Sequence, residues 1–151
     1  MARVTAFTIT SPSFRNEAEI PVEHTCDGAD TPPTLEVSEL PPGTRSFALI
    51  MDDPDAPKGT FTHWLAYNIP AGDGSLDVQS GLSLKNGFGR AGYGGPCPPH
   101  GHGPHRYYFR VFAIDVPSLG LKGDSRQHLE EELRPHTLAT ATLMGRYERR
   151  R

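Results

Sequence analysis

The sequence predicts a mainly β protein, an antiparallel β-sandwich with one or two short helices near the C-terminus. Two observations favour this fold class. Short apolar or alternating segments recur along the chain, and 15 prolines and 16 glycines separate them, a spacing typical of sandwiches. Hydrophobic residues at 36% and charged residues at 22% indicate a globular protein with one core. A length of 151 residues fits a single domain over residues 1–151.

Five segments have the pattern of strands. Residues 4–10 (VTAFTIT) suit a strand with two covered faces, and residues 34–38 (TLEVS) alternate, with Leu35 and Val37 inward. The continuous apolar run at residues 46–52 (SFALIMD) is expected of a central strand. Residues 63–69 (HWLAYNI) and 107–114 (YYFRVFAI) are two further strands.

Helical signals are confined to the C-terminal third. Asp124 or Ser125 can cap a helix through DSRQHLEEELR, in which Leu129 and Leu133 share one face. Pro135 ends this helix or opens a second one, for which HTLATA (136–141) is the candidate. TLMGRY (142–147) then returns to the sheet, and the basic end RYERRR is expected to be solvated.

Charge and patterning exclude several classes of function. A net charge of -3 and a pI near 6.1 argue against a nucleic-acid partner. The chain has no apolar run approaching the roughly 18 residues of a membrane span, and the N-terminus lacks the apolar core of a signal peptide. The expected location is therefore cytoplasmic, where Cys26 and Cys97 are expected to be free thiols.

The stretch GYGGPCPPHGHGPHRYY (92–108) has no helical or strand period, although it leads directly into a predicted buried strand. Such long irregular segments are usually functional or disordered. Glycines allow close backbone approach and prolines stiffen the chain. We interpret the stretch as the wall of a ligand site in which backbone N–H groups and imidazoles face one small volume.

Acidic and imidazole side chains adjoin three of the predicted strands. Asp53 lies at the end of one strand in MDDPDAPKG (51–59), where an ordinary turn is the alternative interpretation. His63 begins the next strand, followed by Trp64, which is as compatible with a core position as with a binding surface. His105 and Tyr107 are two residues apart and would share one face of a strand.

These motifs, DPDAP (53–57), then HW (63–64), then GYGGPCPPHGHGPHRYYF (92–109), resemble the phosphatidylethanolamine-binding protein family, which includes the Raf kinase inhibitor proteins. The similarity covers nearly the whole chain and is greater to the short bacterial and archaeal branch. Between DPDAP and the histidine the chain has only KGTFT (58–62), a shorter insert than eukaryotic members carry.

The resemblance implies a sandwich of two antiparallel sheets with Greek-key connections and a small anion pocket at one end. Family members bind phosphate, acetate or phosphoryl head groups there, and we expect this chain to be a non-enzymatic protein that binds such a ligand without a cofactor or metal. Backbone N–H groups and cationic imidazoles are suitable donors for such a ligand. The expected ligand-binding residues are Asp53, Asp55, Pro57, His63, Trp64, Gly95, Pro96, His105 and Tyr107.

Three alternatives remain open. His63, His105 and the loop histidines, together with Cys97 and Asp53, could form a metal site. Cys97 could instead act as the nucleophile of an enzyme, with a histidine as its base. A role as a kinase or protease inhibitor is the third, because relatives have been assigned both, and a homodimer is expected because short relatives often form one.

Overall fold

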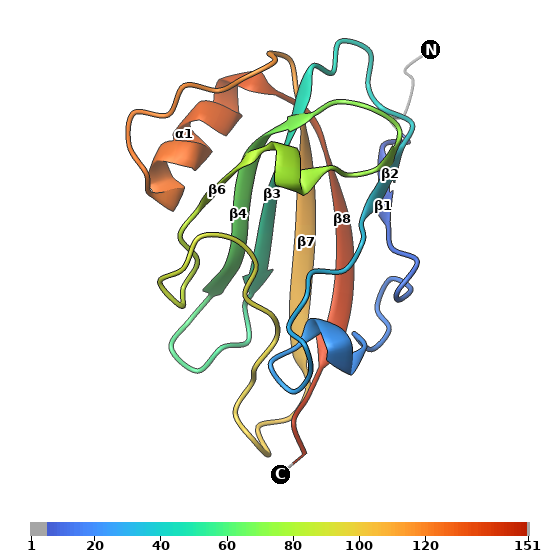
Figure 1. Cartoon of the computed structure of the whole chain (residues 1–151), viewed down its shortest axis with the longest axis vertical. Coiled ribbons are helices and arrows are strands. Elements are labelled where there is room, and N and C mark those ends of the chain that lie inside the picture. The colour runs from blue at the N-terminus through green and yellow to red at the C-terminus, as the bar shows by residue number, and fades with distance from the viewer. Residues whose placement is uncertain (1–5, 151) are drawn as a thin grey trace.

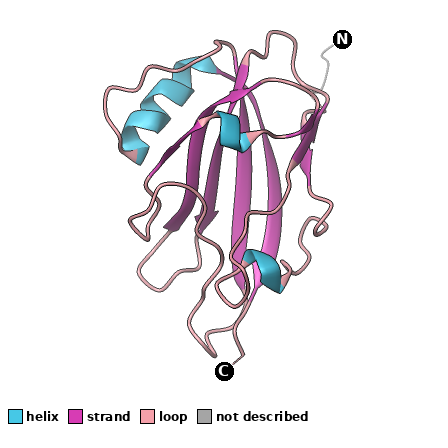
Figure 2. Ribbon diagram, in the orientation of Figure 1, coloured by secondary structure: helices cyan, strands magenta, loops and turns pink. Residues whose placement is uncertain are grey.

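The computed structural model describes residues 6–150 and contains two antiparallel sheets and one α-helix (Figure 1). Figure 2 shows how much of the chain between these elements is loop. The strands are β1 (Thr8–Thr10), β2 (Glu36–Ser38), β3 (Ser46–Asp53), β4 (Phe61–Pro70), β5 (Gly74–Ser75), β6 (Leu82–Leu84), β7 (His105–Ile114) and β8 (Thr137–Tyr147). The helix α1 spans Arg126–His136, and the short 3-10 helices are η1 (Val22–His24) and η2 (Val78–Ser80).

The two sheets have the strand orders β1-β2-β5 and β6-β4-β3-β7-β8. Neighbouring strands pair antiparallel throughout. Although β6 and β7 follow one another in the chain, β4 and β3 lie between them in the sheet. The connection from β6 to β7 therefore crosses two strands, as expected of a Greek key. The predicted mainly β fold is confirmed.

Apolar residues cover both faces of the larger sheet. On one face, side chains such as Phe47, Leu49 and Phe109 pack against Ile9 and Val37 of the smaller sheet and form the core of the sandwich. The other face packs against α1 and the segment before it. Two covered faces explain why residues 46–52 form a continuous apolar run, since every residue of β3 is buried.

Two predictions about secondary structure are wrong, a second helix at residues 136–141 and a strand with two covered faces at residues 4–10. Residues 136–141, the candidate for a second helix, mostly belong to β8, because Ala139 and Ala141 alternate with exposed threonines and pair with β7. The helix α1 runs through Pro135 and ends at His136. Of the predicted strand at residues 4–10, residues 4 and 5 lie outside the described part, and β1 is buried on one face only, through Ile9.

The helix α1 begins at the predicted Ser125 cap, whose hydroxyl accepts a hydrogen bond from the His128 backbone N–H at 3.2 Å. Leu129 and Leu133 are its buried residues. At its first turn, Arg126 donates to both carboxylate oxygens of Asp52, at 2.6 and 2.9 Å. None of the helices within residues 6–150 has the length and apolarity needed to cross a membrane.

The sequence predicted that the basic C-terminal segment is solvated, but part of it packs against the rest of the protein. Arg146 and Tyr147 belong to β8, and Tyr147 is buried. Beyond the strand, the Arg149 Nε lies 3.2 Å from the Asp27 carboxylate. The segment therefore packs against the chain that follows η1, as far as the structure describes it.

Candidate functional site

A small cavity of about 180 Å³ lies where the ends of three strands of the larger sheet meet the long loops. Figure 1 shows these loops gathered at the end of the molecule where the C-terminus lies. Strand ends and the residues beside them provide the polar lining, and loops provide an apolar wall. The lining residues are Asp53, Ala56, Pro57, Phe61, His63, Phe88, Cys97, Pro98, Pro99, His105 and Tyr107.

Asp53 and His105 form a buried hydrogen-bonded pair at the cavity. The His105 Nδ1 lies 2.6 Å from the Asp53 Oδ2, and the exposed fractions of the two residues are 1% and 3%. Because an ionised carboxylate only accepts hydrogen bonds, His105 carries a proton on Nδ1. The other oxygen of Asp53 accepts the backbone N–H of Asp55 at 2.8 Å, which fixes the carboxylate.

His63 reaches the cavity because β4 has an irregular register there. Met51 pairs with Trp64 and Asp52 pairs with Thr62, so His63 has no partner on β3. A bulge of this kind redirects a side chain, and His63 and Trp64 are both buried on the inner side of the sheet. The His63 Nδ1–H donates to the Gly94 carbonyl at 2.6 Å.

Burial lowers the pKa of His63, against the opposing effects of the hydrogen bond to Gly94 and the nearby carboxylates. With its Nδ1–H donated to that carbonyl, the neutral ring has a lone pair on Nε2. This nitrogen forms no hydrogen bond with any residue among those described. His63 thus offers an acceptor when it is neutral and becomes a donor when it is protonated.

Tyr107 is fully buried and lines the cavity beside both imidazoles. Its ring lies edge-on to that of His63, with 5.2 Å between centroids, and is stacked with that of His105 at 6.4 Å. Within residues 6–150 its hydroxyl has no hydrogen-bond partner. Burial, followed by the charge of Asp53, raises the pKa of Tyr107 above its usual range, so the hydroxyl keeps its proton and can donate.

The sequence offered His102 a role only in the metal hypothesis, together with His100, and the structure brings it into contact with His105. The His102 Nδ1 lies 2.6 Å from the His105 Nε2, so both nitrogens of the His105 ring are hydrogen-bonded. The spacing of three residues between these histidines, with glycines on both sides of His102, was visible in the sequence. It became informative only once the loop conformation was known.

Asp55 lies at the rim and outside the cavity. Its carboxylate accepts from the Arg106 side chain at 2.8 and 2.9 Å and from the Arg106 backbone N–H at 2.9 Å. The Arg106 hydrogen bond lowers the pKa of Asp55 to about 2. The three aspartates therefore have different partners, because Asp52 holds α1 and Asp53 holds His105.

Three other expected site residues lie away from the cavity. Trp64 packs edge-on against Tyr93 in the core, with 5.0 Å between ring centroids. Gly95 and Pro96 bond to the chain around η1, and a Cβ on Gly95 would lie 2.3 Å from both the Asp30 Oδ1 and the His24 carbonyl oxygen. These residues anchor the loop behind the cavity wall and do not line the cavity.

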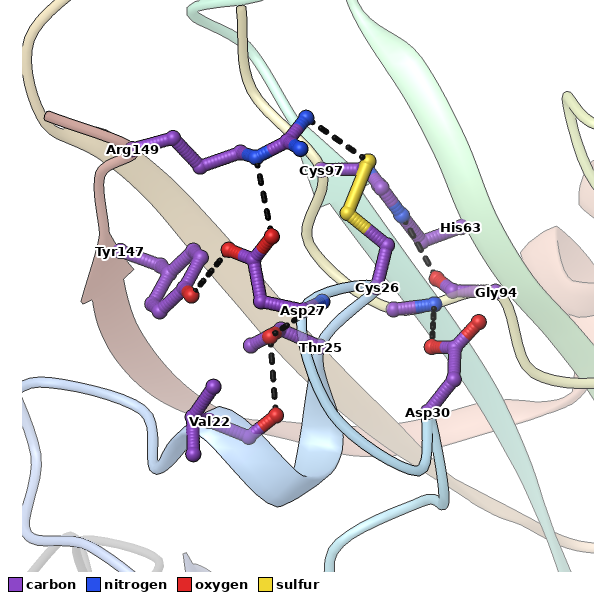
Figure 3. The surroundings of a disulfide bond; sticks show 11 residues. Val22, Thr25, Cys26, Asp27, Asp30, His63, Gly94, Cys97, Tyr147 and Arg149 are labelled. Atoms are coloured by element: carbon purple, nitrogen blue, oxygen red, sulfur yellow. Dashed lines mark hydrogen bonds and ion pairs between the residues drawn. A yellow bond between two sulfur atoms is a disulfide. The ribbon is translucent and has the colours of Figure 1, made fainter. Parts of the chain in front are cut away.

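Cys26 and Cys97 form a disulfide, so the prediction of free thiols is wrong (Figure 3). The fold places their Cα atoms 5.4 Å apart although 71 residues separate them in sequence, which is within bonding range. Since Cys97 has no thiolate to offer, the hypothesis that it is a nucleophile is also wrong. Figure 3 shows Arg149 reaching the Cys97 sulfur, at 3.4 Å.

The metal hypothesis finds no arrangement to support it. Within the part of the chain that the structure describes, there is no group of three or more His, Cys, Asp and Glu side chains placed to hold a metal ion. His105 already gives one nitrogen to Asp53 and the other to His102.

The fold and the cavity together define a β-sandwich with a small pocket at one end of its sheets, in which a few polar side chains face an apolar wall. The family model described as phosphatidylethanolamine-binding protein matches residues 10–148. The chain belongs to the phosphatidylethanolamine-binding protein family, as the sequence motifs predicted.

Relatives agree with this assignment. The "UPF0098 protein" of Aquifex aeolicus is 51% identical and aligns with 93% of this chain and 88% of its own length. The structure of CT736, a phosphatidylethanolamine-binding protein homologue from Chlamydia trachomatis, superimposes with a TM-score of 0.86 at 35% identity, over 97% of this chain and 99% of that one. Escherichia coli YbcL superimposes with a TM-score of 0.84 at 32% identity, over 94% and 98%.

Proposed function

We propose that the cavity binds a small anionic ligand, and that a phosphoryl group is the class its donors suit best. The observation that carries this proposal is the Tyr107 hydroxyl, which is buried without a hydrogen-bond partner in the described chain. Leaving such a group unsatisfied costs about 1–3 kcal/mol. A ligand oxygen would accept the missing hydrogen bond.

The imidazoles favour a negative ligand. Once His63 is protonated, its Nε2–H can donate to an oxyanion in a charge-assisted hydrogen bond. Asp53 accepts from the His105 Nδ1 at 2.6 Å and holds that ring at the cavity. The apolar wall, to which Pro57 and Phe61 belong, lowers the local polarity and strengthens these interactions.

The size of the cavity favours a small group over a drug-sized one. Pockets for drug-sized ligands usually have roughly 300–1,000 Å³, whereas this one has about 180 Å³. The family is named for binding phosphatidylethanolamine, whose head group carries a phosphodiester. Free phosphate and a phosphorylated head group both offer phosphoryl oxygens to these donors, so phosphate and phosphoethanolamine are both used as ligands in the test.

Affinity for the anion should fall as pH rises. Burial lowers the pKa of His63 in the free protein, and a bound anion favours its protonated form. Binding then takes up a proton, so lower pH strengthens it. The fall should lie between the lowered pKa of His63 in the free protein and its higher pKa in the complex.

The test is an NMR titration of the histidine side chains with phosphate, phosphoethanolamine and acetate, repeated with His105→Ala. Saturable shifts at His63 and His105 in the wild type, with the His63 shifts lost in His105→Ala, support the proposal. The ranking of the three ligands separates a phosphoryl site from a general carboxylate site. The absence of shifts with every anion refutes it. Affinity that does not change from pH 5.5 to 8 would mean that backbone amides hold the anion instead of imidazoles.

The inhibitor role, the homodimer, enzymatic use of His105 and the cytoplasmic location stay predictions. A carboxypeptidase Y inhibitor, solved with its cognate proteinase, shares the fold at 17% identity and a TM-score of 0.60, and this likeness carries no function. Residues 52–62 and 92–104 flank the cavity, so a protein docked there would cover it, and phosphate should then weaken its binding. The disulfide is typical of oxidising compartments, so the location should be measured by cell fractionation.

A further inference from the structure

His105 has no nitrogen free for a ligand in the conformation that the structure shows. Its Nδ1 is bonded to Asp53 and its Nε2 to His102, each at 2.6 Å. Because Nδ1 holds a proton for Asp53, the Nε2 of a neutral His105 is an acceptor and His102 donates from its own Nδ1. An anion could reach the Nε2 of His105 only where the His102 ring now lies.

The His102 side chain can leave His105 by rotation, while the backbone beside it is held by the Gly101 N–H, which donates to the Arg149 carbonyl at 2.6 Å. His102 is exposed, whereas His105 is buried. The contact with His105 is the one hydrogen bond that the His102 ring makes among the described residues. Gly101 and Gly103 on either side have φ values of 73° and 92°, a region that glycine enters without strain. Neither glycine has a neighbour within 4 Å of the position a Cβ would take.

We propose that His102 is a resident side chain that occupies the ligand's place on His105, and that a phosphoryl oxygen displaces it. This inference rests on the proposed function and adds a specificity-determining residue to it. Only a ligand oxygen that binds the His105 Nε2 better than a neighbouring imidazole does would enter. A neutral ligand would be disfavoured, since it would only replace one neutral hydrogen-bond partner of the His105 Nε2 with another.

The energetic balance favours exchange with an anion. An exposed imidazole loses little on returning to water, whereas the buried Nε2 of His105 needs a partner in both states. An oxyanion accepts hydrogen bonds only, so His105 must gain a proton on Nε2 when the ligand binds. That proton comes from solvent or from a monoanionic phosphate. The groups facing His105 are Asp53, His102, Tyr107 and, across the cavity, His63.

The strength of the resident contact sets the expected effect. A hydrogen bond with a net value of about 1 kcal/mol corresponds to a factor of about five. The open arrangement is then about one-sixth of the molecules, and the apparent affinity is reduced by that fraction. The substitution His102→Ala should therefore strengthen phosphate binding about sixfold.

The experiment measures phosphate binding calorimetrically at pH 6.5 for the wild type, His102→Ala and His100→Ala. The control changes another exposed histidine of the same loop, whose side chain has no hydrogen bond with the described residues. His100→Ala should match the wild type. In parallel, ¹⁵N spectra of the imidazoles should show the His105 Nε2 hydrogen-bonded in the free wild type and the His102 signals moving toward those of His100 as phosphate is added.

The binding data distinguish displacement of His102 from a direct contact between His102 and the ligand and from no role of His102 in binding. Stronger binding by His102→Ala alone, with release of the His102 ring, supports displacement. Weaker binding would mean that His102 contacts the ligand itself, and unchanged binding would mean that it does not compete; both overturn the displacement while leaving the anion site intact. Absence of binding in the wild type and in His102→Ala overturns the displacement together with the proposed function.

Discussion

The hydroxyl of Tyr107 provides the sharpest prediction, because its removal should change stability and binding in opposite directions. The substitution Tyr107→Phe keeps the ring that packs against His63 and His105. It removes a buried hydroxyl that has no partner within residues 6–150. The free energy of unfolding without ligand should therefore increase by about 1–3 kcal/mol, which raises Tm by about 2–4 °C per kcal/mol for a chain of this size.

Phosphate binding should weaken in the same variant. A hydrogen bond to a charged group contributes about 1.5–3 kcal/mol, so the loss should be roughly 10- to 150-fold in Kd. Urea unfolding gives the stability change, provided that m stays constant, and calorimetry gives the affinity.

Tyr93→Phe is the matched control. Tyr93 is another largely buried tyrosine, but its hydroxyl donates to the His24 carbonyl at 2.6 Å. Removing that hydroxyl should lower the free energy of unfolding by about 1 kcal/mol and leave phosphate binding unchanged. If Tyr107→Phe destabilises the protein as much as Tyr93→Phe does, the Tyr107 hydroxyl is satisfied in solution and our reasoning is wrong.

Three further predictions concern the supports of the site. Reducing the Cys26–Cys97 disulfide opens a link across 71 residues and should lower the free energy of unfolding by about 4 kcal/mol, because the unfolded chain gains entropy. Denaturation with and without dithiothreitol measures this change, and a loss below about 1 kcal/mol would contradict the prediction. Arg126→Ala leaves the buried Asp52 with Arg110, 3.3 Å away, as its one cationic partner within residues 6–150. The substitution should cost about 2–3 kcal/mol of unfolding free energy, less than the ~3–5 of a fully buried pair, because the Arg126 side chain is 30% exposed. Arg126→Lys should recover part of the loss. Because burial lowers the pKa of His63, the unfolded state binds more protons than the folded state between that lowered pKa and ~6.5. The free energy of unfolding without ligand should therefore rise with pH across this window. In urea unfolding at a series of pH values, His63→Gln should flatten the rise.

Much of the fold could be predicted because burial leaves a direct trace in the sequence. The apolar run at residues 46–52 is continuous because both faces of β3 are covered. Residues 136–141 were harder, since alanine favours helices and threonine favours strands. Pairing with β7 along its whole length decided in favour of a strand, and local propensity does not report such long-range pairing.

The site could be predicted only in part, for similar reasons. Asp53, His63, His105 and Tyr107 lie together at the cavity, and their chemistry had drawn attention to them in the sequence. The contact between His102 and His105 depends on the path of a glycine-rich loop. The disulfide depends on two segments that meet only in the folded chain, so an argument from compartment alone gave the wrong answer.

The irregular pairing at His63 separates two kinds of sequence change. Residues 54–60 lie outside the β3–β4 pairing, and adding residues to a loop costs little, so the cavity rim could lengthen or shorten between relatives. A single insertion or deletion within residues 61–64 would instead exchange the faces of the strand and move Trp64 out of the core. The length of residues 54–60 can therefore vary while the paired strands that hold His63 and Trp64 stay unchanged. An engineered binding loop should be inserted between Ala56 and Gly59.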